Sequence, residues 1–376
     1  MITEDLKYFE FKKFPHDFIV EEKLWNVPSW KGHVFYVFFE KKNKNTFDIL
    51  KYLSKELNLK RKHFWIAWLK DKFWITRQWI SIYKRTLNSR WWAKKFLDIL
   101  SKKVKILKYT WWDELLKVWD NKWNLFFLRL RRKDIGKGIS KNYNQKISED
   151  FFKKIVEQCL KEIKENWFPN YFGIQRFWKK FSNPKIWKKL ILWQKFLNDP
   201  LEAQFKVQAY ASWLFNKYIV LRLSEWLFDK FVKWDILVDI LSNKHPIFRL
   251  YLSDTKFEKE KFIVSWPVWG YNLVVSWDFK IKDWMIVKFT ELTPALELEL
   301  EILKQEWLTV NVLANFKKFK VFGIRRPIKV IPSDLRYKWD KNDLLLMFEL
   351  PSWSYASVLV SWLDKLIDEK LTQNLW

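Results

Sequence analysis

The sequence predicts an α+β protein whose core is formed by both ends of the chain and carries an inserted domain. Segments of strand and helix character alternate without the regular period of a βαβ fold. The sequence pattern changes between about Ser182 and Phe322, where long helical patterns precede apolar, strand-like segments. We therefore predict a first core segment at 1–181, an inserted α/β domain at 182–322 and a C-terminal core segment at 323–376.

The first core segment is predicted to start with two strands and a helix. Asp17–Glu22 and Val34–Phe39 have strand-like apolar content. The helix has Thr46 as its N-cap, and its apolar residues recur at helical spacing. These are Phe47, Leu50, Leu53 and Leu57. A later strand, Asn124–Lys133, is expected to place three arginines along a basic edge, namely Arg129, Arg131 and Arg132.

The clearest helix begins after Ser148, which is a suitable N-cap, and ends near Asn166. Its apolar stripe consists of Phe152, Ile155, Val156, Cys159, Leu160 and Ile163. Farther along, Glu202–Leu227 has a helical pattern and Lys261–Val275 a strand-like one. The residues after Phe322 return to strands and turns and close with a helix.

The charge balance points to a polyanionic partner. The formal net charge is +27, from 70 Lys plus Arg against 43 Asp plus Glu. RNA or DNA is the first candidate, because phosphate neutralisation supplies affinity that does not depend on sequence. Codon bias of an AT-rich genome is the alternative, since most of the basic residues are Lys and since Asn, Ile and Phe are frequent too.

Several protein classes are excluded by what the sequence lacks. One cysteine, Cys159, rules out a disulfide framework, and four scattered histidines make a zinc site improbable. The start, "MITEDLKYFEFKKF", is acidic and lacks the apolar stretch of a signal peptide. The longest charge-free run, Phe262–Trp277, is too short to cross a bilayer. We expect a cytoplasmic protein that is not bound to a membrane.

Tryptophan and glycine occur in unusual numbers. The chain has 28 Trp and 6 Gly, whereas glycine normally makes up about 7% of residues. Many of the Trp residues fall where a turn or a helix end would favour glycine, as in "PSWKGH", "DNKWN" and "NWFPN". We hypothesise that many of these letters are UGA codons that the native host reads as glycine. A Trp-rich binding surface is the alternative.

The stretch "IAWLKDKFWITRQW", Ile66–Trp79, contains a single acidic residue, Asp71. By itself, a lone Asp between Lys70 and Lys72 reads as a solvated surface charge. The two lysines favour its ionised form, which suits a nucleophile better than a general acid.

This stretch resembles the signature of the tRNA pseudouridine synthase D (TruD) family, Ala-Gly-x-Lys-Asp-Lys-x-Ala-Val-Thr-x-Gln-Trp, with Trp68 at the glycine. Other stretches resemble family motifs in the same order along the chain. They are "FKKFPHDFIVEEKLWNVPSWKGH", "LKVWDNKWNLFFLRLR", "WFPNYFGIQRFW" and "LPSWSYASVLV". In these stretches the family's glycines correspond to Trp25, Trp30, Trp119, Trp123, Trp167, Trp178 and Trp353.

The resemblance implies a pseudouridine synthase core, which is a mixed, largely antiparallel sheet with flanking helices, and an inserted domain. It also implies isomerisation of uridine to pseudouridine in tRNA, at position 13, without a metal or organic cofactor and without an obligate protein partner. Asp71 corresponds to the essential aspartate, which attacks either the uracil ring or the ribose carbon. The substrate-binding residues implied are Lys12, Phe18, Asn170, Phe172 and Tyr355. Tyr355 stands where the bacterial family commonly has phenylalanine.

Two alternatives remain at this point. The first is a non-catalytic RNA-binding protein or RNA chaperone on the same fold, and the second is an aromatic surface for single strands or membrane interfaces. Arg176 is expected to contact either a phosphate or a carboxylate of the protein. Further candidates for phosphate contacts are Lys70, Lys72, Arg77, Arg129 and Arg131, for each of which a solvated basic face is the other interpretation.

Overall fold

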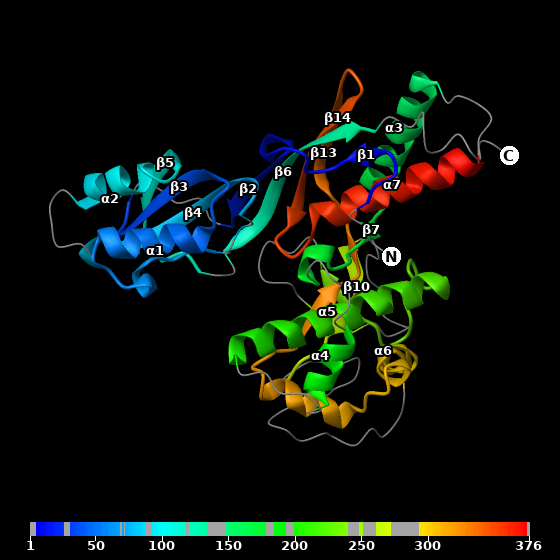
Figure 1. Ribbon diagram of the computed structural model, residues 1–376. Helices are drawn as coiled ribbons and strands as arrows, with labels where there is room; N and C mark the ends of the chain where they lie inside the picture. The colour runs from blue at the N-terminus through cyan, green and yellow to red at the C-terminus, as the bar shows by residue number, and fades with distance from the viewer. Residues whose placement is uncertain are drawn as a thin grey trace. The chain divides into compact units, whose positions relative to one another are not determined.

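A computed structural model describes residues 5–25, 31–67, 70, 72–86, 92–117, 120–133, 148–177, 184–192, 199–239, 248–250, 261–271 and 293–373 (Figure 1). The chain divides into two compact units. The core unit comprises Asp5–Glu165, Pro332–Ala356 and Asp364–Trp376, and the middle unit comprises Met1–Glu4, Asn166–Ile331 and Ser357–Leu363.

An eight-stranded sheet forms the centre of the core unit, in the order β13-β14-β6-β2-β4-β3-β5, with β1 paired to β6. Strands β2 and β4 are parallel, and the other described pairs are antiparallel. The strands are β1 (Phe9–Glu10), β2 (Phe18–Leu24), β3 (Val34–Lys42), β4 (Ile75–Tyr83), β5 (Lys105–Trp112), β6 (Asn121–Arg132), β13 (Ser333–Asp340) and β14 (Asp343–Pro351). The helices are α1 (Thr46–Glu56), α2 (Trp92–Ser101), α3 (Glu149–Glu165) and the part of α7 (Ala356–Gln373) outside Ser357–Leu363. The predicted α+β class and the mixed, largely antiparallel sheet with flanking helices are confirmed.

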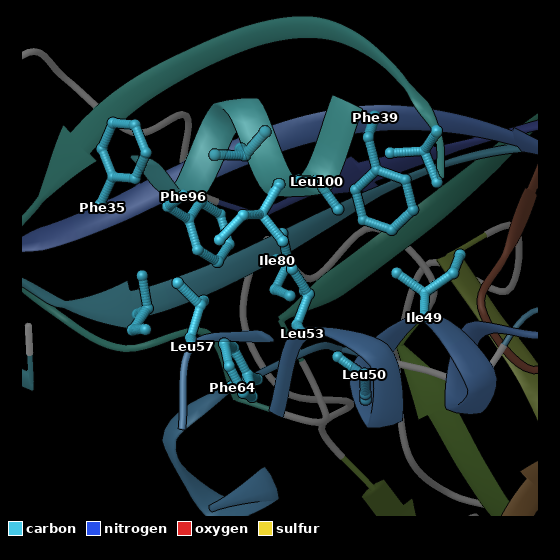
Figure 2. Packing of buried hydrophobic residues seen from close by; sticks show 14 of the residues in the cluster. Phe35, Phe39, Ile49, Leu50, Leu53, Leu57, Phe64, Ile80, Phe96 and Leu100 are labelled. Carbon is cyan, nitrogen blue, oxygen red and sulfur yellow. The ribbon is translucent and has the colours of Figure 1, made fainter. Parts of the chain in front are cut away.

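Strand β3 is buried on both of its faces, which explains its continuous apolar run. Phe35, Val37 and Phe39 point into a cluster with Ile80 and Leu53, residues of β4 and α1. Figure 2 shows side chains of α1 and α2 meeting those of β3 and β4 in this cluster. The alternate residues of β3 pack on the opposite face of the sheet, against a second cluster made up of Ala67, Trp79 and Leu116. Ile66 packs against the first cluster and Ala67 belongs to the second, so both clusters anchor the chain shortly before Lys70.

The N-cap of α1 is Asn45, so the prediction that Thr46 caps this helix is wrong. The Asn45 backbone is extended, and its side chain accepts a hydrogen bond of 3.0 Å from the Phe47 amide. Thr46 is instead the first helical residue, and its buried hydroxyl donates to Gln78 Oε1 at 2.9 Å. Phe47, expected in the apolar stripe, is 42% exposed.

Helix α3 agrees with the prediction. The Ser148 hydroxyl accepts a hydrogen bond of 3.2 Å from the Phe151 amide, as an N-cap does. All six residues of the predicted stripe are buried.

The middle unit contains a four-stranded sheet, β11-β10-β8-β9, and the two-stranded pair β12-β7. Its strands are β7 (Phe168–Pro169), β8 (Ile236–Asp239), β9 (Phe248–Leu250), β10 (Phe262–Val268), β11 (Ile324–Pro327) and β12 (Lys329–Val330). Its helices are α4 (Pro184–Ile191), α5 (Pro200–Ser224) and α6 (Pro294–Gln305). The unit is longer than the predicted inserted domain at both ends, because β7 pairs with β12 and β11 pairs with β10. The boundaries at 182 and 322 stay a prediction.

Two tryptophans occupy left-handed positions just beyond helix ends. Trp226 has φ of 57° after α5, and Trp307 has φ of 56° after α6. At each site the next residue's amide bonds back five residues, from Leu227 to Arg222 and from Leu308 to Leu303, both at 2.8 Å. This is the Schellman helix end, whose left-handed residue is usually glycine.

The same two tryptophans are the most exposed large hydrophobic residues that the structure describes, Trp226 at 83% and Trp307 at 87%. After α1 the equivalent position is Asn58, a residue that tolerates left-handed backbone. Other indoles are buried, among them Trp79, Trp187 and Trp266. The hypothesis that many Trp letters stand for glycine therefore stays a prediction, with Trp226 and Trp307 as its best test positions.

Candidate active site

The loop before β2 contains Lys12, and Phe18 is the first residue of that strand in the core unit. Lys12 has a left-handed backbone with φ of 63°, which is unfavourable by about 1–2 kcal/mol for a residue with a side chain. Its ammonium lies 4.4 Å from the ring centroid of Phe18 and 5.3 Å from that of Trp74. Phe18 also packs edge-on against Phe11 and Phe126, at 5.8 and 5.9 Å between centroids. The structure thus brings two of the predicted substrate-binding residues together.

Asp17 holds this loop in place from within the protein. Its two carboxylate oxygens accept hydrogen bonds of 2.8 Å from the Arg131 guanidinium, and one of them also accepts from the Phe14 amide at 3.0 Å. Burial alone would raise the pKa of the Asp17 carboxyl, but these bonds hold that pKa below its ordinary value. Asp17 is therefore a structural anion.

Lys70, the residue before Asp71, is anchored on three sides. Its carbonyl oxygen accepts a hydrogen bond of 3.3 Å from the buried Lys41 ammonium. Its own ammonium donates to Asn124 Oδ1 and lies 3.9 Å from Glu22 Oε1. The Lys70 side chain is only 8% exposed, so its prediction as a phosphate contact is wrong.

Glu22 is the buried anion of this group. Its Oε2 accepts a hydrogen bond of 2.9 Å from the Trp79 amide. Burial raises the pKa of the Glu22 carboxyl above its ordinary value of 4.5, although Lys70 and the Trp79 amide oppose the rise. Burial therefore disfavours the ionised form of Glu22, and Lys70 and the Trp79 amide partly offset this cost.

Asp71, Trp68 and the Trp letters at 30, 119 and 178 lie outside the described residues. Lys72 and Phe73 follow Asp71 at the surface, and the Phe73 ring is 65% exposed. Tyr355 belongs to the core unit and is half-buried, directly before α7.

Asn170 and Phe172 belong to the middle unit and are described within it. The Asn170 side chain is 1% exposed and donates from Nδ2 to the Pro327 carbonyl at 2.9 Å. Its Oδ1 accepts a hydrogen bond of 2.8 Å from Arg326 Nη2. The Arg326 guanidinium also lies 3.7 Å from the ring centroid of Phe172. A side-chain amide has two N–H groups and two oxygen lone pairs. The bonds of Asn170 to Pro327 and Arg326 use one N–H group and one lone pair.

The deciding observation comes from comparison with known proteins. A family model described as tRNA pseudouridine synthase D (TruD) matches residues 8–196 and 194–361. The chain belongs to the TruD family. The match takes in both units and confirms the family resemblance of the sequence motifs.

Named relatives cover nearly the whole chain. A tRNA pseudouridine synthase D of Helicobacter hepaticus is 30% identical over an alignment of 380 residues, which covers 93% of this chain and 91% of the relative. Its counterpart in Wolinella succinogenes is 27% identical, over 94% of this chain and 93% of the relative. The crystal structure of a putative TruD of Methanosarcina mazei matches with a TM-score of 0.66 and 17% identity, covering 96% of this chain and 94% of that one. At that identity the structural match supports the TruD fold alone.

Several arginines of this TruD chain bind carboxylates of the protein. Strand β6 lies between β14 and β2 in the sheet, so the predicted basic edge is wrong, whereas the predicted phosphate contacts stay predictions. Arg77 bonds to Glu21 and Glu40, at 3.2 and 2.9 Å. Arg129 bonds to Asp340 and Asp343, and Arg131 binds Asp17 as described above. Arg132 stacks its guanidinium 3.1 Å from the ring centroid of Phe152. The described hydrogen bonds of Arg176 go to Ser212 and Gln208, both at 3.3 Å, and not to a carboxylate, so its phosphate contact stays a prediction.

No described helix is long and apolar enough to cross a bilayer. Within the same residues, no three His, Cys, Asp or Glu side chains gather closely enough to hold a metal ion.

Proposed function

We propose that this protein is a tRNA pseudouridine synthase that isomerises a uridine of tRNA, at position 13, to pseudouridine. The observation that carries the proposal is the family match, which spans residues 8–196 and 194–361, together with relatives named tRNA pseudouridine synthase D. The net charge of +27 suits a tRNA partner. We place the reaction in the cytoplasm, since a chain with one cysteine suits a reducing compartment.

In this proposal Asp71 is the nucleophile. It attacks the uracil ring or the ribose anomeric carbon while the bond between N1 and that carbon breaks. The base then rotates and C5 forms the new bond to the ribose carbon. The bond to Asp71 breaks and restores its carboxylate, C5 loses its hydrogen as a proton, and N1 gains a proton. The net change is a redox-neutral rearrangement, so the proposal assigns no metal or organic cofactor.

The other residues bind the uridine, which must leave the helical stack before its base can rotate. Phe18, Phe172 and Tyr355 supply rings for stacking, and Asn170 bonds the uracil edge. Lys12 pairs with the nucleophile. The anchoring of Lys70 by Lys41, Asn124 and Glu22 supports this assignment, because a nucleophile needs a rigid neighbouring backbone.

The test is tritium release from a tRNA transcript that contains uridine labelled at C5, followed by mapping of pseudouridine. We expect release by the wild-type chain, a single modified position at 13, and no release by D71N. D48N is the matched control, because Asp48 is an exposed acid on α1, and it should keep wild-type activity. Wild-type protein that binds the tRNA without releasing tritium would establish the RNA-binding alternative instead.

A further inference from the structure

The segment Asn170–Phe172 is held by an arginine from a distant part of the sequence. Arg326 lies on β11 and is 3% exposed. Its Nη2 donates to Asn170 Oδ1 at 2.8 Å, to the Asn170 carbonyl at 3.0 Å and to the Tyr171 carbonyl at 3.3 Å. One guanidinium nitrogen therefore binds both the backbone and the side chain of this segment.

These bonds decide which way the Asn170 amide faces. A guanidinium nitrogen donates and never accepts, so the amide oxygen must face Arg326. The amide nitrogen then faces the Pro327 carbonyl, to which it donates at 2.9 Å. The Asn170 backbone amide donates to the Ile328 carbonyl at 2.7 Å, which fixes the same residue from the main chain. Asn170 thus has a single amide orientation in the unit.

The same guanidinium supports the Phe172 ring. Its Cζ lies 3.7 Å from the ring centroid, a distance at which a buried cation and an aromatic face attract. Phe215 packs edge-on against the ring, at 5.5 Å between centroids. The Asn216 side chain accepts from the Phe172 amide at 2.7 Å and donates to its carbonyl at 3.0 Å. The ring is therefore held through both its side chain and its backbone.

We infer that Arg326 is a positioning residue for pseudouridine formation, because it orients the Asn170 amide and the Phe172 ring toward the extruded uracil. The inference rests on the proposed function, in which those two residues bind the base. Reacting groups must be held closely, and a misplacement of about 1 Å lowers the rate about 100-fold. Arg326 itself touches neither the base nor the nucleophile in this role.

Arg325 provides a matched control on the same strand. Its guanidinium donates to Glu299 Oε1 at 2.7 Å and to Ser265 Oγ at 3.1 Å. Its side chain is 4% exposed, so replacing it perturbs the middle unit as replacing Arg326 does. Its described hydrogen bonds go to Glu299 and Ser265 and not to the segment 170–172, so this variant separates a general loss of stability from a loss of orientation.

The experiment compares R326M, R326K, R325M, N170A and the double variant N170A/R326M by tritium release from the C5-labelled tRNA transcript. We expect R326M to lower kcat about 100-fold with KM changed by less than about threefold. R326K should lower kcat at least about tenfold, since an ammonium cannot both donate in a plane and stack on the ring. In the N170A background, R326M should lower kcat by a clearly smaller factor than in the wild-type background, because one of the two groups that it orients is already gone.

Three results would overturn the inference. They are wild-type kcat in R326M or R326K, an R326M loss that is equally large with and without Asn170, and equal kcat losses in R325M and R326M. If R326M does not fold, R326K and the double variant N170A/R326K allow the same comparison of kcat with and without Asn170. Absence of tritium release by the wild-type chain would instead reject the proposed function.

Discussion

Glu22 Oε1 lies 3.9 Å from Lys70 Nζ, and both side chains are buried inside the core unit. The pair links β2, which follows the Lys12 loop, to the residue before Asp71. A buried charge that loses its opposite partner is strongly destabilising, because the remaining ion is no longer compensated. This relationship makes Glu22 a useful position for mutation.

E22Q is expected to lower the free energy of unfolding by about 1–3 kcal/mol and to lower kcat for tRNA. The glutamine keeps the bond from the Trp79 amide but removes the negative charge near Lys70. Urea unfolding and tritium release measure the two effects. E21Q is the control, because Glu21 forms a partly exposed pair with Arg77 and should change stability by no more than about 1 kcal/mol. Equal effects of E21Q and E22Q would contradict the prediction.

The raised pKa of Glu22 predicts a pH dependence of stability. Between the ordinary value of 4.5 and the raised value, the folded chain binds the Glu22 proton and the unfolded chain does not. Folding is therefore favoured as the pH falls through this window, and the contribution is lost as the pH rises above the raised pKa. The free energy of unfolding of wild type minus that of E22Q should decrease as the pH rises from 4.5. A difference that rises or stays constant would show that Glu22 does not titrate in this way.

K41M removes the buried ammonium group that donates to the Lys70 carbonyl oxygen. The Lys41 ammonium donates to the carbonyl oxygens of Lys44 and Lys70, at 2.9 and 3.3 Å, and methionine fills a similar volume without a donor. We expect kcat to fall about 10-fold or more, because the backbone next to Asp71 loses an anchor. K42M is the control, since Lys42 is the exposed neighbour on the same strand. Wild-type kcat in K41M would rule out this role.

The sequence was sufficient for elements whose pattern is local. The stripe of α3, the continuous apolar run of β3 and the strand at β2 follow from side-chain periodicity, and the structure has all three. The cap of α1 differs by one residue, because Asn45 and Thr46 are both good caps and only the backbone angles distinguish them.

Contacts between side chains far apart in the chain could not be predicted from the sequence. Arg129 binds Asp340 and Asp343, more than two hundred residues away, and periodicity along one strand cannot reveal such partners. Lys41 lies in a run of lysines that reads as solvated, although it is 1% exposed. The roles of Asn124 and Arg326 likewise depend on contacts between distant segments. Asp71, Lys12, Phe18, Asn170, Phe172 and Tyr355 came from the family motifs, and their roles stay predictions.

The helix ends at Trp226 and Trp307 predict that glycine stabilises the protein. An L-residue in left-handed backbone is disfavoured by about 1–2 kcal/mol, and neither exposed indole regains this by packing. W226G and W307G should each raise the free energy of unfolding by about 1 kcal/mol in urea. N58G, at the same position after α1, should raise it by less, because asparagine tolerates this backbone. W79G should lower it by about 3–5 kcal/mol, because the Trp79 ring is buried against Phe38.

Peptides of the protein isolated from its native cells test whether tryptophan letters stand for glycine. We expect mass spectrometry to show glycine at positions 226 and 307, where the backbone is left-handed and the indoles are exposed. Position 79 should carry tryptophan, since its ring lies in the core between Tyr36 and Phe38. Position 79 is the internal control, because a systematic error in assigning peptide masses would affect it in the same way as positions 226 and 307. Tryptophan at 226 and 307 would reject codon reassignment at those positions, and the chain would then carry two strained helix ends whose exposed indoles need another explanation.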